Sequence, residues 1–408
     1  MASLVSQSVW GRRGVSRVSG RLWMVLLSVL LAVMCFPGGV NAADLVPAAD
    51  VTGKDSAPYS AAILMEPETG TILFEKDAHI PWQPASMVKM MTTLVVLEQI
   101  RDGQIGMDEE VSTSRWAARM GGSQVYLKEG EIFTVRELLR AVMIHSANDA
   151  AAALAEYVAG SPEAFVDLMN DKAEQLGLKE TQYNSVHGLP AEPGQEEDRM
   201  SAYDLALLGR ELLLFPKAAE WAATSQAPFR DDTFLLFNPN QLLQRYRGAD
   251  GIKTGYHKQA GYCVTASAQR GDLRLIAVVL GTEQRSQRFL STTRLLNRGF
   301  AHYRMVVAVK PGDALAHHAF VQGGVRERVP LVAVGEIRAL VKKSEIKKIQ
   351  IDIDVSERVP APITAGQVVG SVVVTLNGTR LGQTQAASAR DVAQASLWER
   401  WWPFGREY

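Results

Sequence analysis

Three short motifs hold the residue types needed for nucleophilic chemistry, and the first is SMVK at residues 86–89. Ser86 offers a hydroxyl and Lys89 an amine, three positions apart. Residues at this spacing lie on one face of a helix, so the amine can approach the hydroxyl. Ser344 and Lys347 repeat the spacing within the charged segment KKSEIKK, where a solvated surface explains it. The first motif therefore predicts a nucleophile only in combination with other features.

The second and third motifs are SAN at residues 146–148 and KTG at residues 253–255. Each has a plain structural interpretation on its own. Ser146 and Asn148 could cap the alanine-rich segment that follows them, and Lys253 could be a surface lysine at a turn. The three motifs in this order within one chain are far more specific than any one of them. Together they indicate a single active site.

The chemistry of such a site depends on an unprotonated lysine. An ordinary lysine has a pKa near 10.4, so it is charged at neutral pH and cannot accept a proton. Burial, the positive end of a helix and the nearby charge of Lys253 all favour the neutral amine. We therefore predict that Lys89 is the base that activates Ser86.

The chain has 408 residues, which is too long for one ordinary core and indicates two domains. Residues 1–42 have the three parts of a secretory signal: four arginines, an apolar run over residues 22–36, and the small-residue end VNA. The run of 15 residues is shorter than the roughly 20 needed to cross a bilayer, so we expect a cleaved signal in preference to a retained anchor. A lipoprotein site at Cys35 is rejected because Val33 and Met34 have the wrong size.

Charge and cysteine content exclude other classes. Without residues 1–42 the chain keeps 39 of its 43 basic residues and all 44 acidic ones, which gives a net charge of −5. Such a chain has no electrostatic basis for binding nucleic acid. One cysteine, Cys263, remains, so the exported protein has no internal disulfide and must depend on a large core.

The pattern between residues 43 and 304 predicts an α/β (α+β) domain in which helices cover an antiparallel sheet. Apolar runs at residues 63–65 and 72–74 flank EPETG and indicate a β-hairpin. Two helices begin with cap signals, Ser161 before a proline and Ser201 paired with Asp204. The full set of expected elements is helices over residues 134–144, 150–158, from 162 onward and 202–214, and strands over residues 262–267 and 273–280.

After about residue 305 the expected elements are short strands. IQIDIDV at residues 349–355 alternates apolar and polar residues, and Asn377-Gly378 is a strong hairpin signal. Residues 305–388 are therefore predicted to form a small all-β domain, a sandwich.

The tail over residues 389–408 is predicted to be an amphipathic helix. On a helical wheel one side carries Ala393, Leu397, Trp398, Trp401 and Trp402, and the other carries Ser396, Glu399 and Arg400. Indole rings favour the headgroup region of a bilayer, so we expect the tail to lie on a membrane surface. The alternative is a helix docked on its own protein.

These motifs resemble those of the low-molecular-mass penicillin-binding proteins, the serine-type D-alanyl-D-alanine carboxypeptidase family. The resemblance runs from about Ala57 to the C-terminus and includes SVHGLP at residues 185–190, SAYDLALLG at 201–209 and KTGYHKQAGYCVTASA at 253–268. Pro190 departs from the pattern, because relatives usually carry an acid there. The resemblance implies a transpeptidase/β-lactamase-like catalytic domain over residues 43–304, followed by the β-rich domain and the membrane-associating tail.

By this resemblance, Ser86 attacks the carbonyl between two D-alanines and forms an acyl-enzyme, with Lys89 as base and Ser146 as proton relay. The backbone N–H groups of Ser86 and Tyr256 form the oxyanion hole. The substrate-binding residues that it implies are Asn148 for an amide, Lys253, Thr254 and Arg288 for the terminal carboxylate, and Gly255 to admit the substrate backbone. Arg285, three residues from Arg288, is the alternative to it.

Three histidines lie beside the motifs. His145 lies beside Ser146 but adjacent side chains point apart, His187 is expected to form structural hydrogen bonds, and His257 is expected at the pocket rim. No spacing among the seven histidines resembles a zinc site, so we predict no metal and no cofactor.

The predicted substrates are peptidoglycan stem pentapeptides, and the predicted inhibitors are β-lactams, which would acylate the same serine. The predicted location is the periplasmic face of the cytoplasmic membrane. A β-lactamase would need a fixed glutamate, and Glu192, Glu196 and Glu197 lie in a loop expected to be mobile. A DD-endopeptidase that cuts cross-links would use the same residues, with loop shape deciding between the two, and a wall-binding protein with a silent site is the non-enzymatic alternative.

Overall fold

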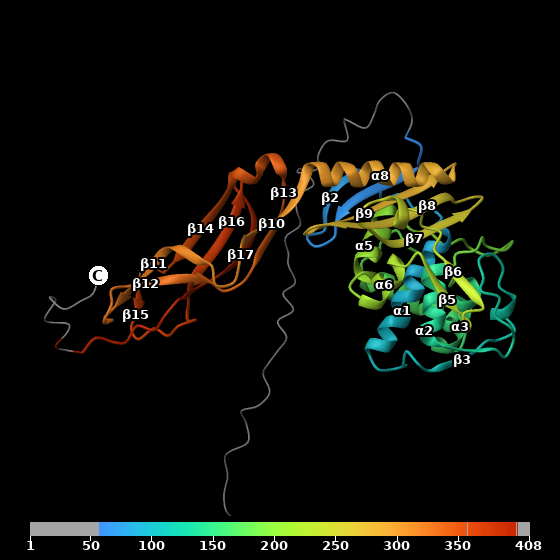
Figure 1. Ribbon diagram of the computed structural model, residues 1–408, viewed down its shortest axis with the longest axis horizontal. Coiled ribbons are helices and arrows are strands. Elements are labelled where there is room, and N and C mark those ends of the chain that lie inside the picture. The colour runs from blue at the N-terminus through green and yellow to red at the C-terminus, as the bar shows by residue number, and fades with distance from the viewer. Residues whose placement is uncertain (1–56, 357, 397, 399–408) are drawn as a thin grey trace, which may run out of the picture. The chain divides into compact units, whose positions relative to one another are not determined.

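The computed structural model describes residues 57–356, 358–396 and 398. Its catalytic domain is built on a five-stranded antiparallel sheet with the strand order β2-β1-β9-β8-β7 (Figure 1). The predicted hairpin and the predicted pair of later strands are both confirmed. The strands are β1 (Ala61–Glu66), β2 (Thr71–Lys76), β7 (Ala249–His257), β8 (Gly261–Arg270) and β9 (Leu273–Thr282).

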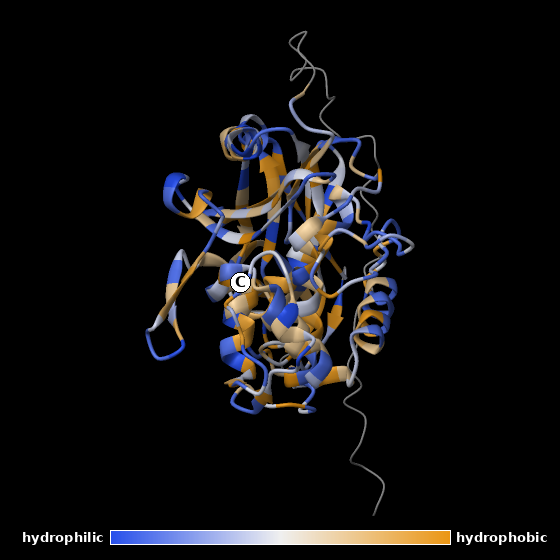
Figure 2. Cartoon of the chain, turned by 90° about the vertical axis from the view of Figure 1, so that its right-hand side faces the viewer, coloured by the Kyte–Doolittle hydropathy of each residue, from blue (hydrophilic) through white to orange (hydrophobic). Residues whose placement is uncertain are grey.

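Helices cover both faces of this sheet, which is why its strands are apolar almost without interruption. Ile63 and Met65 face the core formed with the helical cluster, whereas Ala62 and Leu64 face the core formed with α8. Figure 2 shows hydrophobic residues gathered on the inner helices and on the sheet. The helices are α1 (Lys89–Arg101), α2 (Val135–Arg140), α3 (Asn148–Ala159), α4 (Pro162–Gln175), α5 (Ala202–Leu212), α6 (Pro216–Ala223), α7 (Leu242–Arg245) and α8 (Arg285–His302).

Local signals placed several helix ends correctly. Ser161 and Ser201 accept hydrogen bonds from the backbone three residues later and so cap α4 and α5, as predicted. The helix predicted over residues 134–144 is shorter, because α2 ends at Arg140 and continues as the wide π turn Ala141–His145. Such turns often mark functional positions. Shorter elements complete the domain: 3-10 turns Ala85–Val88 (η3) and Ala117–Arg119, and strand pairs β3 (Glu110–Ser112) with β4 (Ile132–Thr134) and β5 (Gln226–Phe229) with β6 (Phe234–Phe237).

The second domain is all-β, as predicted. Its six-stranded sheet has the order β14-β16-β17-β12-β11-β15, and β10 pairs with β13 in a separate two-stranded sheet. Valines 329, 372 and 374 lie at the centre of its core. The strands are β10 (Tyr303–Val309), β11 (Ala314–Gln322), β12 (Arg328–Ala333), β13 (Ile337–Lys342), β14 (Ile349–Val355), β15 (Val359–Pro360), β16 (Val368–Leu376) and β17 (Thr379–Ser388); the 3-10 turn Lys343–Lys348 precedes β14.

The expected start of the tail helix at residue 389 is wrong. Val392 forms a β-bridge with Ile363, Gln394 forms one with Gly324, and Ala395 is buried. This stretch therefore belongs to the β-domain. Its backbone pairs with two other segments of that domain, although the residue pattern around Ala393 is that of an amphipathic helix. Most of the remaining tail (397 and 399–408) lies outside the described residues. Among the residues described, none of the helices is long and apolar enough to span a bilayer.

Candidate active site

Ser86 and Lys89 lie in one continuous turn at the start of α1. Ser86 is part of η3, and α1 begins at Lys89. The Nζ atom of Lys89 lies 3.2 Å from Ser86 Oγ and 2.6 Å from the carbonyl oxygen of His187. Lys89 is completely buried, whereas Ser86 is partly exposed. The amine and hydroxyl of the first motif are thus in hydrogen-bond contact, and the hydroxyl remains accessible to a substrate.

The surroundings of Lys89 favour its neutral form. Burial lowers the pKa of the Lys89 amine well below its usual value, and the positive charge of Lys253 lowers it further. The carboxylates of Asp198 and Asp149 oppose this effect. Burial is the largest of these effects, so the surroundings disfavour the charged form of the amine.

Ser146 and Asn148 follow the π turn and present unpartnered polar atoms. Ser146 has a left-handed backbone (φ 67°), and its buried Oγ has no hydrogen-bond partner in the described chain. Asn148 donates from Nδ2 to Gly121 O over 2.6 Å, and its Oδ1 is buried and unpartnered there. The N-cap of α3 is Ala147, with no side-chain cap, so the capping interpretation of this motif is wrong. A buried polar atom without a hydrogen-bond partner is costly, which indicates that a bound ligand supplies the partners of these two atoms.

The KTG motif lies on β7, the edge strand of the sheet, which packs against η3. Lys253 and Thr254 are almost fully buried, and burial together with the charge of Arg288 lowers the pKa of Lys253 to about 7. A Cβ atom on Gly255 would lie 2.4 Å from the carbonyl oxygen of Pro84. Gly255 therefore leaves room for the backbone at Pro84, which precedes the turn that carries Ser86.

Arg288, on α8, is buried, while the alternative Arg285 is exposed. The Nη1 atom of Arg288 donates to the carbonyl oxygens of Gly255 (3.1 Å) and Cys263 (3.2 Å). Arg288 thus links β7 and β8 through hydrogen bonds, and its positive charge lies near Lys253. Tyr256 follows Gly255 at the sheet edge; its half-exposed ring stacks on Tyr262 with centroids 4.1 Å apart.

Comparison with known proteins decides the family. The family model for D-alanyl-D-alanine carboxypeptidases of peptidase family S11 matches residues 50–284, and that for the C-terminal domain of penicillin-binding protein 5 matches residues 303–394. The chain is 38% identical over 341 residues to the D-alanyl-D-alanine carboxypeptidase DacF of Bacillus subtilis, which covers 83% of this chain and 86% of the relative.

The chain belongs to the D-alanyl-D-alanine carboxypeptidase family.

Two solved structures are similar to this carboxypeptidase. One is a peptidoglycan synthesis regulatory factor (PBP3) from Streptococcus pneumoniae, with a TM-score of 0.70, 29% identity, and coverage of 83% of this chain and 100% of the other. The other is penicillin-binding protein D2 from Listeria monocytogenes in its ampicillin-bound form, with a TM-score of 0.55, 30% identity, and coverage of 60% and 98%. The expected family, its fold and its activity as a serine D-Ala-D-Ala carboxypeptidase are therefore confirmed.

Sequence reasoning missed Asp198 and Gly188, which hold the loop and the turn next to Lys89 in place. Asp198 is buried and accepts hydrogen bonds from the backbone N–H groups of Asn184 and Ser185 and from the Ser185 hydroxyl. It thereby fixes the loop whose His187 carbonyl accepts from Lys89. The motif SVHGLP contains Gly188 directly after His187. The backbone that Gly188 approaches is that of Ala85, about a hundred residues earlier in the chain, so the motif alone did not reveal this contact.

The three histidines flanking the motifs have backbone hydrogen-bond partners, which was predicted for His187. The Nδ1 atoms of His145, His187 and His257 accept hydrogen bonds from the backbone N–H groups of Phe237, Leu189 and Ala260. Burial lowers the pKa of His187 to about 3, so this ring stays neutral beside Lys89. The described residues contain no group of three histidine, cysteine or acidic side chains arranged to hold a metal ion.

The acidic loop of residues 191–200 gives no glutamate suited to a β-lactamase. Glu192 and Glu196 are exposed, and the carboxylate of Glu197 accepts a hydrogen bond from the Ala191 N–H. The loop is nevertheless held at Asp198, so its expected mobility does not extend over its whole length.

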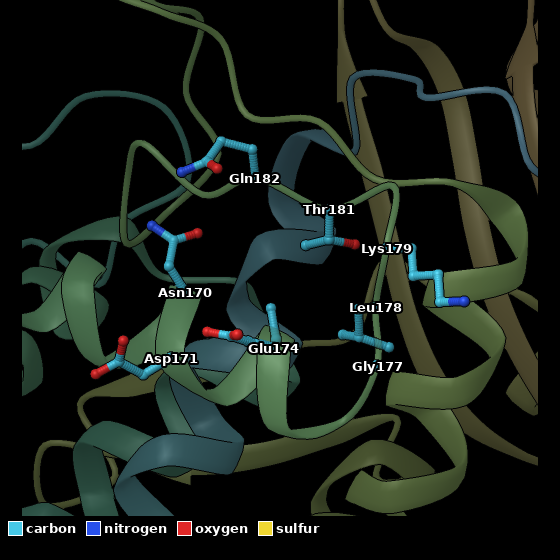
Figure 3. Close-up of a pocket in the computed structure, with 9 residues that line it drawn as sticks. Asn170, Asp171, Glu174, Gly177, Leu178, Lys179, Thr181 and Gln182 are labelled. Carbon is cyan, nitrogen blue, oxygen red and sulfur yellow. The ribbon is translucent and has the colours of Figure 1, made fainter.

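A separate cavity of about 460 Å³ lies beside α4, outside this site (Figure 3). Figure 3 shows Asn170, Asp171 and Glu174 on α4, with the Asn170 side chain directed toward Gln182. The amide of Asn170 is already paired with the Tyr183 backbone, and Thr181 Oγ1 donates to Asp204. We assign no chemistry to this cavity.

Proposed function

We propose that this carboxypeptidase removes the terminal D-alanine from peptidoglycan stem pentapeptides through an acyl-enzyme on Ser86. The observation that carries the proposal is the 3.2 Å contact between Ser86 Oγ and the buried amine of Lys89, whose pKa burial lowers. A hydroxyl becomes an effective nucleophile when a base within hydrogen-bond reach takes its proton.

In the acylation step, the Ser86 proton passes to Lys89 Nζ while Ser86 Oγ bonds to the carbonyl carbon between the two D-alanines. The electron pair of the C=O bond moves to its oxygen, which the backbone N–H groups of Ser86 and Tyr256 stabilise. When the tetrahedral intermediate collapses, the C–N bond breaks and Ser146 relays the proton from Lys89 to the departing amine. The unpartnered, buried Oγ of Ser146 supports this role. Water then attacks the carbonyl carbon of the ester, with its proton passing to Lys89. The C–O bond to Ser86 breaks, Ser86 Oγ takes the proton from Lys89, and the shortened peptide leaves as a carboxylate.

The two ends of the substrate are held by different groups. Lys253 and Thr254 bind the terminal carboxylate, with Arg288 adding positive charge from behind the strand. The charge near Lys253 and the absence of an acidic partner in the described chain support this assignment. Asn148 holds the amide on the amino-terminal side of the scissile bond, since its Oδ1 has no partner in the described residues.

The protein is proposed to act at the outer face of the cytoplasmic membrane. Residues 1–42 would direct export, and the tail after residue 395 would bind the membrane surface through its tryptophans. Trp398 is 85% exposed, which favours membrane contact over docking on the protein itself.

The proposal is tested with fluorescent penicillin and with mass analysis of products from a peptide ending in D-Ala-D-Ala. Wild-type protein should release one D-alanine from the peptide. Penicillin should label it at Ser86 and be released slowly. The Ser86→Ala variant should show neither reaction. Lys89→Arg should slow labelling by at least about a hundredfold, because a guanidinium stays protonated and cannot serve as the base.

The matched control is Lys258→Arg, which makes the same change at an exposed lysine and should label normally. Wild-type labelling rates in Lys89→Arg would contradict the proposed base. Rapid turnover of penicillin by the wild type would identify a β-lactamase.

A further inference from the structure

Tyr126 has a strained backbone and an exposed ring in the loop that contacts the SAN motif. Its φ of +58° lies in the left-handed region, which a bulky residue rarely adopts. Such a conformation is energetically unfavourable and persists only where the surroundings impose it. The Tyr126 ring is nevertheless 65% exposed, so the tyrosine contributes little to core packing.

The surroundings impose this conformation from both sides. The buried carboxylate of Asp149 accepts from the N–H groups of Val125 (3.1 Å) and Leu127 (3.0 Å). Arg230 donates to the carbonyl oxygens of Val125 and Tyr126, both over 3.1 Å. Glycine or asparagine would meet these backbone demands without strain, so the hydrogen bonds do not explain why a tyrosine stands here.

The position of the ring connects it to the active site. Tyr126 lies edge-on to Phe234 (6.3 Å between centroids), and Phe234 lies edge-on to His145 (5.4 Å), the residue before Ser146. In the same loop, Ser123 O accepts from the Asn148 N–H over 2.7 Å. Tyr126 therefore stands beside the Ser146–Asn148 end of the site, and Lys253 and Thr254 lie on a different element, β7.

We propose that Tyr126 is a specificity-determining residue whose ring packs against a long side chain on the residue preceding D-alanyl-D-alanine. This rests on the proposed function, in which β7 holds the carboxylate end and Asn148 holds the amino-terminal side of the scissile bond. The preceding residue then leaves the site on the side of Tyr126. An aromatic face attracts aliphatic carbons and also a terminal ammonium group, so a lysine-like side chain fits this surface.

The test compares two peptides that differ only in the residue before D-Ala-D-Ala, lysine in one and glycine in the other. Tyr126→Asn, which tolerates the left-handed backbone, should lower kcat/KM for the lysine peptide by roughly three- to tenfold and leave the glycine peptide unchanged. Tyr126→Phe should behave as wild type on both. Leu214→Asn, the matched control at an exposed apolar residue away from the motifs, should change neither.

The outcomes separate this inference from the proposed function. An equal loss of kcat/KM on both peptides, or no loss on either, would overturn the role of Tyr126. A lowered melting temperature of the Tyr126→Asn variant would also overturn it, because it would show that the ring stabilises the fold. Penicillin labelling of Ser86 reports on the proposed function alone. Normal labelling in all variants with an altered lysine-to-glycine ratio in Tyr126→Asn is the expected result.

Discussion

At the scale of single residues, the proposed mechanism requires two buried lysines in opposite protonation states. Lys89 must be neutral to take a proton, whereas Lys253 must be charged to bind a carboxylate. Burial lowers the pKa of both lysines. The positive charge of Lys253 lowers the pKa of Lys89 further, and the positive charge of Arg288 lowers the pKa of Lys253 further. Because Lys253 and Lys89 interact, the pKa values that kinetics report belong to the pair.

This arrangement predicts a bell-shaped pH profile of kcat/KM for the peptide. Activity should fall at low pH as Lys89 gains a proton, and it should fall at high pH as Lys253 loses one, with the basic limb near the value of about 7 for the free enzyme. Lys253→Arg should move the basic limb upward by at least about one pH unit, because a guanidinium keeps its charge. A basic limb that stays in place in Lys253→Arg would assign it to another group.

At the scale of elements, β7 and the SVHGLP loop, which are distant in sequence, both contact the turn at residues 84–88 that carries Ser86. Gly255 on β7 approaches the Pro84 carbonyl, and Gly188 in the SVHGLP loop approaches Ala85. Ala85 itself has a positive φ of 50°. A turn held this tightly on both sides positions Ser86 and Lys89 before substrate arrives, which lowers the cost of reaching the reactive geometry.

Two glycine variants test this packing. Both Gly188 and Gly177 have positive φ, but a Cβ on Gly188 would lie 2.0 Å from Ala85 O, whereas one on Gly177 meets nothing within 4 Å. Gly177→Ala should lower the free energy of unfolding by only about 1 kcal/mol and acylate normally. Gly188→Ala should lose more stability in urea and acylate at least roughly tenfold more slowly. Wild-type acylation by Gly188→Ala would show that the loop does not position the turn.

At the scale of the whole molecule, the β-domain ends later than the apolar pattern of its strands indicates. Residues 389–395 form bridges to the segments around Gly324 and Ile363 and bury Val392 and Ala395. The membrane-binding part proposed for the tail therefore begins after this stretch.

Two truncations distinguish these parts. Removal of the residues after 396 should leave peptidase activity and melting temperature unchanged and release the protein from lipid vesicles in a sedimentation assay. Removal after 388 should also lower the melting temperature of the β-domain, because it uncovers apolar residues and breaks backbone pairs. Continued sedimentation of the shorter-tailed protein cut after 396 would exclude the tail as the membrane anchor.

The sequence by itself determined the features that depend on near neighbours. The order of the three motifs predicted the family, the Ser161 and Ser201 caps placed two helix starts, and the hairpin at residues 61–76 followed from its turn. Each depends on contacts within a few residues, where spacing and residue type are enough. The approach of Lys89 to Ser86 belongs here as well, since three positions separate them.

Only the tertiary structure decided the features that depend on distant contacts. The Lys89 amine reaches a carbonyl 98 residues away, Gly255 leaves room for the Pro84 carbonyl of its own chain, and Asp149 and Arg230 together impose the backbone of Tyr126. The same limit explains the error at residue 389, where a local helical signal competed with long-range packing. Local patterns carry no record of which distant segment will close over them, because that choice is made by burial of the whole chain.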